Sequence, residues 1–313
     1  MHVTRYAVEH RDRWDAFVRE SKNGTFLLNR GYMDYHSDRF VDHSLLFQNE
    51  KGRLVAILPA NERDGVLQSH GGLTYGGVIS DQSMTTPAML QVFGALVSYL
   101  HANRIKSLLY KTIPYVYHHF PADEDRYALF RIGARLRRRD VLSVVCTSAR
   151  LPMQKRRLRK VALGQKLGLA IEESQEFAAF WTVLEANLLA THGVTPVHSL
   201  SEITLLKSRF PESIRLHVCK ENGQVVAGVV MFNSSHVAHV QYISSSERGR
   251  EIGALDLLFS TLMDNDYAVL PYFDFGISNE DEGRRLNVGL VEQKEGFGAR
   301  AVVHDHYELD VPL

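Results

Sequence analysis

The chain has 313 residues, a length that suits two domains better than one, and its 36 basic and 36 acidic side chains predict no general affinity for polyanions. Its apolar fraction of 45% is typical of an ordinary globular protein, and no apolar run approaches the roughly 20 residues of a membrane span. The charge is uneven, because residues 1–160 hold 25 Lys or Arg against 15 Asp or Glu, whereas residues 161–313 hold 11 against 21. This asymmetry indicates two domains that dock or a positive face for an anionic substrate.

The two cysteines predict buried thiols, because Cys146 and Cys219 both occur in apolar runs. No Cys/His spacing resembles a zinc site, so we expect no metal. The first residues lack the apolar core of a signal peptide, so we expect a cytoplasmic protein.

In the first half, a glycine-rich loop at Ser69–Gly77 follows a predicted hairpin and precedes a helix expected over Thr85–His101. Four glycines in seven residues predict either a crossover between strands or a loop whose bare backbone lines a cleft. In the second case His70 and Tyr75 would bind substrate. Tyr115, in a His-aromatic cluster, would either contact substrate or pack at the surface.

A basic segment follows, since residues 126–160 hold 12 Lys or Arg and one acid. The periodicity predicts an amphipathic helix over 153–166 that links two domains. Its basic side chains fit a solvated face, contact with a phosphate, or, less readily, a nucleic acid.

The second half predicts a strand, two helices (177–191 and 201–209), three antiparallel strands, a helix from Ala254 and a final group of elements. The three strands are expected at 215–220, 225–232 and 237–243, joined by turns such as Asn222-Gly223. The first half shows a degenerate version of this order, which indicates a tandem duplication.

The closing stretch, Tyr272–Arg300, carries the most specific motif. An apolar strand predicted over Tyr267–Phe275 ends in Asp274-Phe275-Gly276, and Gly289–Gly298 has the pattern Gly-x-x-x-x-Lys-x-Gly-Phe-Gly. Two glycines around an aromatic residue mark a sharp turn or a close approach of the backbone. Lys294, just before that turn, is placed to meet an anion.

These motifs and this element order resemble the FemABX-like acyltransferases, which are built from two domains of the Gcn5-related N-acetyltransferase (GNAT) fold. The resemblance implies an α/β (α+β) protein with two tandem GNAT-like domains, each a mixed, mostly antiparallel sheet flanked by helices. Residues 1–150 would be a degenerate N-terminal domain and 151–313 the acyltransferase domain. The glycine-rich run at His70 also resembles the first domain of one bacterial branch of GNAT proteins. In the family pattern Lys294 lies at the active site.

The resemblance implies acetyl-coenzyme A or another acyl-coenzyme A as the donor. The family binds the pyrophosphate with Arg/Gln-x-x-Gly-x-Gly/Ala between a strand and a helix, and Arg250, Gly253 and Ala254 match this in part, with Arg248 nearby. Leu255 departs from the pattern, and an ordinary strand-to-helix loop is the alternative. The preceding strand, at Gln241, Tyr242 and Ile243, would supply backbone donors to the thioester carbonyl.

Proton transfer requires groups that titrate near neutrality, and the loop between two predicted helices offers His192 and His198. Glu280 is a second candidate base and Tyr242 a further catalytic candidate, so the residues leave the base open. Capping or structural hydrogen bonds explain the histidines equally well. Asp274, Asn279 and Asn287 would orient the acceptor.

The sequence therefore predicts transfer of an acyl group, acetyl in the simplest case, from coenzyme A to an amine. The acceptor would be a small molecule, an amino sugar or a cell-envelope precursor. Two alternatives stay open: an aminoacyltransferase of the peptidoglycan type that uses aminoacyl-tRNA, and a non-catalytic ligand-binding protein with a GNAT fold. A nucleic-acid partner is expected only under the first of these.

Overall fold

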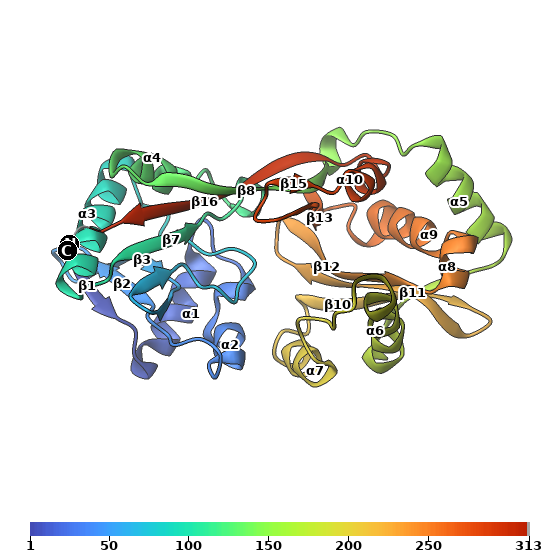
Figure 1. The fold of residues 1–313 in the computed structure, drawn as a ribbon, viewed down its shortest axis with the longest axis horizontal. Coiled ribbons are helices and arrows are strands. Elements are labelled where there is room, and N and C mark those ends of the chain that lie inside the picture. The colour runs from blue at the N-terminus through green and yellow to red at the C-terminus, as the bar shows by residue number, and fades with distance from the viewer. Residues whose placement is uncertain (312–313) are drawn as a thin grey trace. The chain divides into compact units, whose positions relative to one another are not determined.

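The computed structural model describes residues 1–311, apart from the side chain at position 192, and they form two compact units (Figure 1). Unit 1 comprises Met1–Asp140, Asp281–Arg285 and the described residues from Val303 onward. Unit 2 comprises Val141–Glu280 and Leu286–Val302. This division differs from the predicted one, 1–150 and 151–313, because the last strand returns to pair with a strand of unit 1.

Unit 1 contains a four-stranded antiparallel sheet in the order β1-β2-β3-β6 and a second group in the order β4-β5-β7-β16-β8. The strands are β1 (His2–Arg5), β2 (Leu45–Gln48), β3 (Leu54–Leu58), β4 (Asn61–Arg63), β5 (Val66–Gln68), β6 (Ile79–Ser80), β7 (Ser107–Lys111), β8 (Arg135–Cys146) and β16 (Arg300–Asp310). Strands β8 and β16 each run from one unit into the other. In unit 1, β16 pairs antiparallel with β7, with His306 opposite Lys111.

The helices of unit 1 are α1 (Arg11–Glu20), α2 (Arg30–Met33), α3 (Thr86–Ala102) and α4 (Glu124–Arg131). Helix α3 confirms the predicted one, with the Thr85 hydroxyl accepting a hydrogen bond from the amide of Ala88 and Pro87 in its first turn. Its apolar face, which includes Phe93, belongs to the core of the unit.

The excess of basic residues in the first half of the chain is partly balanced inside unit 1, because acidic residues late in the chain pair with the basic strand β8. Arg139 binds both carboxylate oxygens of Asp305, at 2.6 and 2.9 Å. Arg135 lies 2.8 Å from Asp310 in an exposed pair. An exposed pair such as Arg135–Asp310 contributes at most about 1 kcal/mol to stability, whereas Asp305 is buried beneath Arg139.

Unit 2 has the strand order β8-β13-β12-β11-β10-β9. Its strands are β9 (Ala170–Ser174), β10 (Ile214–Glu221), β11 (Gln224–Asn233), β12 (Val237–Ser245) and β13 (Tyr272–Ile277), with a small β14 (Asn279–Glu280) and β15 (Arg285–Leu286). Neighbouring strands run antiparallel except β12 and β13, which run parallel. The predicted mixed, mostly antiparallel sheet is thus confirmed.

Helices cover both faces of this sheet (Figure 1). They are α5 (Lys155–Lys166), α6 (Phe177–His192), α7 (Leu200–Arg209), α8 (Glu247–Ile252), α9 (Ala254–Thr261) and α10 (Val288–Glu295). Helices α6 and α7 lie on one face, and α9 lies on the other with α5 against it. The basic helix predicted over 153–166 is α5, which begins at Lys155. Ser199 caps α7 in a capping box with Glu202.

The strand predicted over Tyr267–Phe275 begins five residues later, at Tyr272. The preceding residues do not extend, because α9 continues into a π-helical turn at Leu262–Asp266 that buries Leu262 and Met263. Among residues 1–311, none of the helices combines the length and apolarity that crossing a lipid bilayer requires.

Candidate active site

The parallel pairing of β12 with β13 is short. It covers Val237–His239 opposite Tyr272–Asp274, and within residues 1–311 no pairing of these strands continues beyond that point. A bulge in β12 follows, because Val240 pairs with Met231 and Tyr242 with Val230, which leaves Gln241 as the extra residue. Bulges of this kind redirect side chains and are frequent beside active sites.

A small cavity of about 30 Å³ lies where the two strands separate. Its lining residues come from β12, β13, α9, α10 and the turn after α10: Val240, Ile243, Phe259, Phe275, Leu290, Gln293, Lys294 and Phe297. The lining is largely apolar, with the lysine as its one ionisable group. A charge in such surroundings interacts more strongly with a developing charge than it would in water.

Lys294 is buried, with 8% of its surface exposed, and its ammonium group donates hydrogen bonds to the carbonyls of Gly276 (3.1 Å) and Ile277 (2.6 Å). Burial lowers the pKa of Lys294 to about 8, and the nearby Asp274 charge acts in the opposite direction. The lysine is therefore fixed at the end of β13, and burial brings its pKa closer to the physiological range.

The Lys-x-Gly-Phe-Gly turn forms as predicted. Phe297 is buried against Phe259 and Phe275, and Gly298 has a φ of +96°. A side chain at Gly298 would collide with the carbonyl of Leu151. The turn therefore anchors the end of α10, and with it Lys294, against the body of unit 2.

Asp274 is fully buried, which does not fit its predicted contact with the acceptor. One carboxylate oxygen lies 2.9 Å from Nδ1 of His239, and the other accepts a hydrogen bond from the amide of Gly276 at 2.7 Å. The pair joins β12 to β13 at the last residues that the two strands align. Its position makes Asp274 a residue that holds the strand ends in place.

The predicted pyrophosphate loop lines a second cavity, of about 350 Å³. The residues from the loop and α8 are Ser245, Ser246, Glu247 and Arg250, and those from α6 are Thr182, Val183, Ala186, Asn187, Ala190 and Thr191. Arg250 Nη1 donates to the Asn187 side chain (3.0 Å) and to the carbonyl of Ser245 (2.9 Å). Arg248 instead makes a two-pronged pair with Glu221, outside this cavity.

Two other predicted cofactor residues do not line the cavity. Gly253 has a φ of +75°, and a Cβ atom there would lie 2.6 Å from the carbonyl of Lys160 in α5. Ala254 is fully buried in the core. These small residues therefore form the joint between α8 and α9 and its close packing on α5.

The structure brings His198 and Tyr242 together. The Tyr242 hydroxyl lies 2.5 Å from Nδ1 of His198 and accepts a hydrogen bond from its amide at 3.1 Å. Both residues are buried, and the tyrosine ring packs edge-on against Trp181 of α6. They therefore occupy the α6 face of β12, whereas Lys294 lies with Phe259 of α9, so the predicted catalytic residues form two groups. The side chain of His192 lies outside the described part of the chain.

The polar residues predicted around the end of β13 are near one another. Asn287 caps α10, with its oxygen accepting from the amide of Leu290, and its amide nitrogen donates to exposed Glu280 at 3.0 Å. The Asn279 side chain accepts from the amide of Val141 at 2.8 Å. Asn279 and Asn287 thus shape the backbone here, and Glu280 is the accessible carboxylate.

The substrate residues predicted in unit 1 are mostly enclosed. His70 is buried, and burial lowers its pKa to about 3. The buried Tyr75 hydroxyl lies 2.8 Å from that of Thr25. A Cβ atom at Gly77 would lie 2.9 Å from the Tyr110 hydroxyl, so close packing on β7 accounts for this glycine. Among the predicted substrate residues of unit 1, Tyr115 is the one that solvent reaches, because half of its surface is exposed.

Comparisons with known proteins agree with this architecture. Residues 149–283 match the family model of the acetyltransferase (GNAT) domain. No curated protein sequence matches the chain significantly.

Several solved structures resemble the whole chain. FemX superposes with a TM-score of 0.68 at 11% identity, covering 97% of both chains. L-PGS from Bacillus licheniformis gives 0.61 at 12% identity, covering 96% of this chain and 92% of the other. A tandem GNAT protein from the clavulanic acid biosynthesis pathway gives 0.51 at 9% identity, covering 100% and 99%. At these identities the likeness shows the fold.

The family match covers residues 149–283, and the whole chain shares its fold with FemX and with a tandem GNAT protein. The resemblance drawn from the Asp-Phe-Gly and Lys-x-Gly-Phe-Gly motifs is thereby confirmed.

Proposed function

We propose that the protein transfers an acyl group from coenzyme A to an amine, with the chemistry in unit 2. The observation that carries the proposal is the separation of β12 and β13 after His239 and Asp274, with Lys294 fixed beside it. Beyond His239 the edge of β12 is no longer paired with β13 in the described chain, so its backbone can donate to a substrate carbonyl. Donors of this kind stabilise the oxyanion of acyl transfer.

The reaction forms a carbon–nitrogen bond and breaks the carbon–sulfur bond of a thioester. The amine loses a proton, and the departing thiolate gains one. A protonated Lys294 suits charge stabilisation of the oxyanion or thiolate, because its two carbonyl partners fix its position without neutralising it. Glu280 is our candidate for receiving the amine proton, since it is an exposed carboxylate beside the end of β13.

The cavity between α6 and the start of α8 fits the phosphates of the donor in part. Arg250 supplies a cation, and Ser245 and Ser246 supply polar groups. Two free thiols, Cys146 and Cys219, agree with a reducing, cytoplasmic setting in which acyl-coenzyme A is available. The acceptor we favour is a small amine, an amino sugar or an envelope precursor.

One observation favours a second donor. Glu247 also lines the cavity, and a carboxylate at that position repels a pyrophosphate. An aminoacyl-tRNA would place its ester rather than a pyrophosphate near unit 2, and the exposed basic side chains of α5, such as Lys155 and Arg159, suit a nucleic-acid backbone. This alternative predicts binding that weakens steeply as the salt concentration rises.

Thermal unfolding of the full chain separates the donors. A ligand that binds only the folded state raises the melting temperature, so millimolar acetyl-coenzyme A should raise it under the first proposal. Release of free coenzyme A thiol should then depend on an added amine. A rise with aminoacyl-tRNA and none with acetyl-coenzyme A would select the alternative, and no response to either would contradict acyl transfer.

A further inference from the structure

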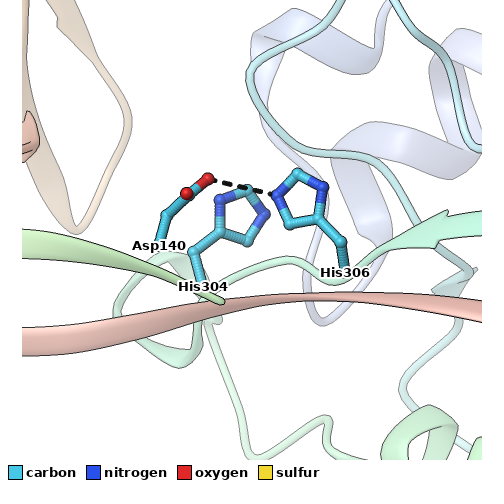
Figure 2. Close-up of side chains that lie close together, drawn as sticks. All are labelled: Asp140, His304 and His306. Carbon is cyan, nitrogen blue, oxygen red and sulfur yellow. Dashed lines mark ion pairs between the residues drawn. The ribbon is translucent and has the colours of Figure 1, made fainter. Parts of the chain in front are cut away.

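Unit 1 holds a cluster of three metal-binding side chains that the acyl-transfer site does not use. Asp140 comes from β8, and His304 and His306 come from the neighbouring strand β16 (Figure 2). Residues two apart on a strand project to the same face, so the two imidazoles stand side by side. One ligand atom of each residue lies within 4.8 Å of the other two.

The distances suit a shared cation better than a direct hydrogen bond. His306 Nε2 lies 3.4 Å from Asp140 Oδ2, and this nitrogen is buried and makes no hydrogen bond within the described residues. Two ligands that each bind a tetrahedral Zn²⁺ at about 2.0 Å are about 3.3 Å apart. A buried nitrogen without a hydrogen bond is costly, and coordination would remove that cost.

The surroundings orient the ligands in the way that metal sites require. His304 Nε2 donates to the carbonyl of Thr112 at 2.8 Å, which fixes its tautomer and leaves Nδ1 with a lone pair for the cluster. Arg138 Nε lies 2.9 Å from each oxygen of Asp140 and holds the carboxylate. Outer partners of this kind are the usual supports of metal-binding histidines and carboxylates.

We propose that Asp140, His304 and His306 bind a divalent transition-metal ion, with Zn²⁺ the best match to two imidazoles and one carboxylate. Three protein ligands leave a fourth position for water. The ion would tie β8 to the returning strand β16 inside unit 1. The expectation of no metal rested on Cys/His spacing, which gives no signal for a cluster whose third member, Asp140, is far from the histidines in sequence.

The competing interpretation is a network of hydrogen bonds and ion pairs without metal. Arg138 already neutralises part of the Asp140 charge, and the buried Lys111 lies close enough to affect His304 electrostatically. Both cations oppose a further positive ion. A direct contact between His306 and Asp140 would then account for the 3.4 Å separation.

Zinc binding by tag-free, full-length protein distinguishes the two. We expect one zinc per chain after removal of excess metal by gel filtration, measured by elemental analysis. Titration against a chromophoric chelator should give a single site, and Co²⁺ should produce the visible absorption of a low-symmetry site. His306→Gln should weaken zinc binding by about a hundredfold, because it removes one of three protein ligands. His101→Gln, an exposed histidine on α3, is the matched control and should leave binding unchanged.

Arg138→Gln adds a test that requires no ligand to be lost. If Arg138 acts as an outer partner that orients Asp140, its removal should weaken zinc binding by about tenfold, the lower end of effects from outer partners. The proposal is overturned if wild-type protein retains no zinc and competes for none at micromolar concentration. It is equally overturned if His306→Gln and His101→Gln bind zinc as tightly as the wild type.

Discussion

The ammonium group of Lys294 lies 2.6 Å from the carbonyl oxygen of Ile277, at the residue where β13 ends. This hydrogen bond and the one to the Gly276 carbonyl cross from α10 to the strand that carries the Asp-Phe-Gly motif, so the two motifs of the closing stretch meet at the Lys294 ammonium group. The relationship also changes what a mutation should do. A lysine that donates hydrogen bonds to buried backbone carbonyls contributes to the stability of the fold as well as to the charge of the site.

We therefore expect Lys294→Met to lose both activity and stability. Loss of a charge stabiliser in an apolar site costs about 3 kcal/mol in the transition state, about a hundredfold in kcat. The carbonyls of Gly276 and Ile277 also lose a buried donor, which lowers the free energy of unfolding by about 1–3 kcal/mol. Steady-state kinetics and urea unfolding measure the two effects. Lys166→Met, on the exposed side of α5, is the control, and equal kcat in the two variants would remove Lys294 from the site.

The lowered pKa of Lys294 predicts a specific pH dependence of stability. Its pKa is about 8 in the folded protein and near 10.4 when unfolded, so between these values the unfolded chain binds more protons. The free energy of unfolding of the wild type, relative to Lys294→Met, should therefore rise from pH 8 to about pH 10.4. Urea unfolding of both proteins at half-unit pH intervals measures this difference. A difference that stays flat or falls would show that burial does not depress this pKa.

Gly253→Val should destabilise the protein. If Gly253 served only to bind the donor, the same substitution would leave the fold intact. A Cβ atom at Gly253 would meet the Lys160 carbonyl at 2.6 Å, and its φ of +75° strains any branched residue. We expect a loss of about 3 kcal/mol or more. Gly193→Val is the matched control, because Gly193 has a φ of +66° with open space around it. Equal losses in the two variants would show that backbone strain, rather than packing on α5, governs position 253.

Tyr242→Phe tests whether the pair with His198 is catalytic. The hydroxyl serves both the amide and Nδ1 of His198, so its removal should cost about 1–2 kcal/mol of stability. We expect kcat to stay within about tenfold, because the ring faces α6 rather than Lys294. A fall of a hundredfold or more with unchanged stability would instead identify Tyr242 as a general acid. Tyr127→Phe, at an exposed position, is the control.

The fold was largely predictable, because its elements carry local signals. The caps of α3 and α7 and the turn at Asn222-Gly223 mark their own boundaries, and the Lys-x-Gly-Phe-Gly motif specifies its turn. The beginning of β13 was not predictable, because the apolar residues Tyr267–Leu270 suit a buried strand and the end of a helix equally well. The return of β16 to unit 1 depends on a long-range pairing that no local pattern encodes.

The candidate site was predictable only at Lys294, because the local Lys-x-Gly-Phe-Gly motif marks this residue in the sequence. Whether Gly253 meets a phosphate or a helix depends on α5, which is distant in sequence. Burial of Asp274 likewise depends on pairing with His239 across two strands. Asn187 was missed because it reaches the donor loop from the middle of α6, where an isolated asparagine gives no signal.

Calorimetric titration of acetyl-coenzyme A into the wild type, Arg250→Gln and Arg248→Gln tests the central claim most directly. The two arginines lie within one turn of α8, but Arg250 lines the cavity and Arg248 is held by Glu221 outside it. We predict binding to the wild type and to Arg248→Gln, and affinity at least about tenfold weaker for Arg250→Gln, since a charge-assisted bond to phosphate contributes about 1.5–3 kcal/mol. Absence of binding to the wild type, or equal affinity in all three proteins, would contradict the assignment of this loop to an acyl-coenzyme A donor.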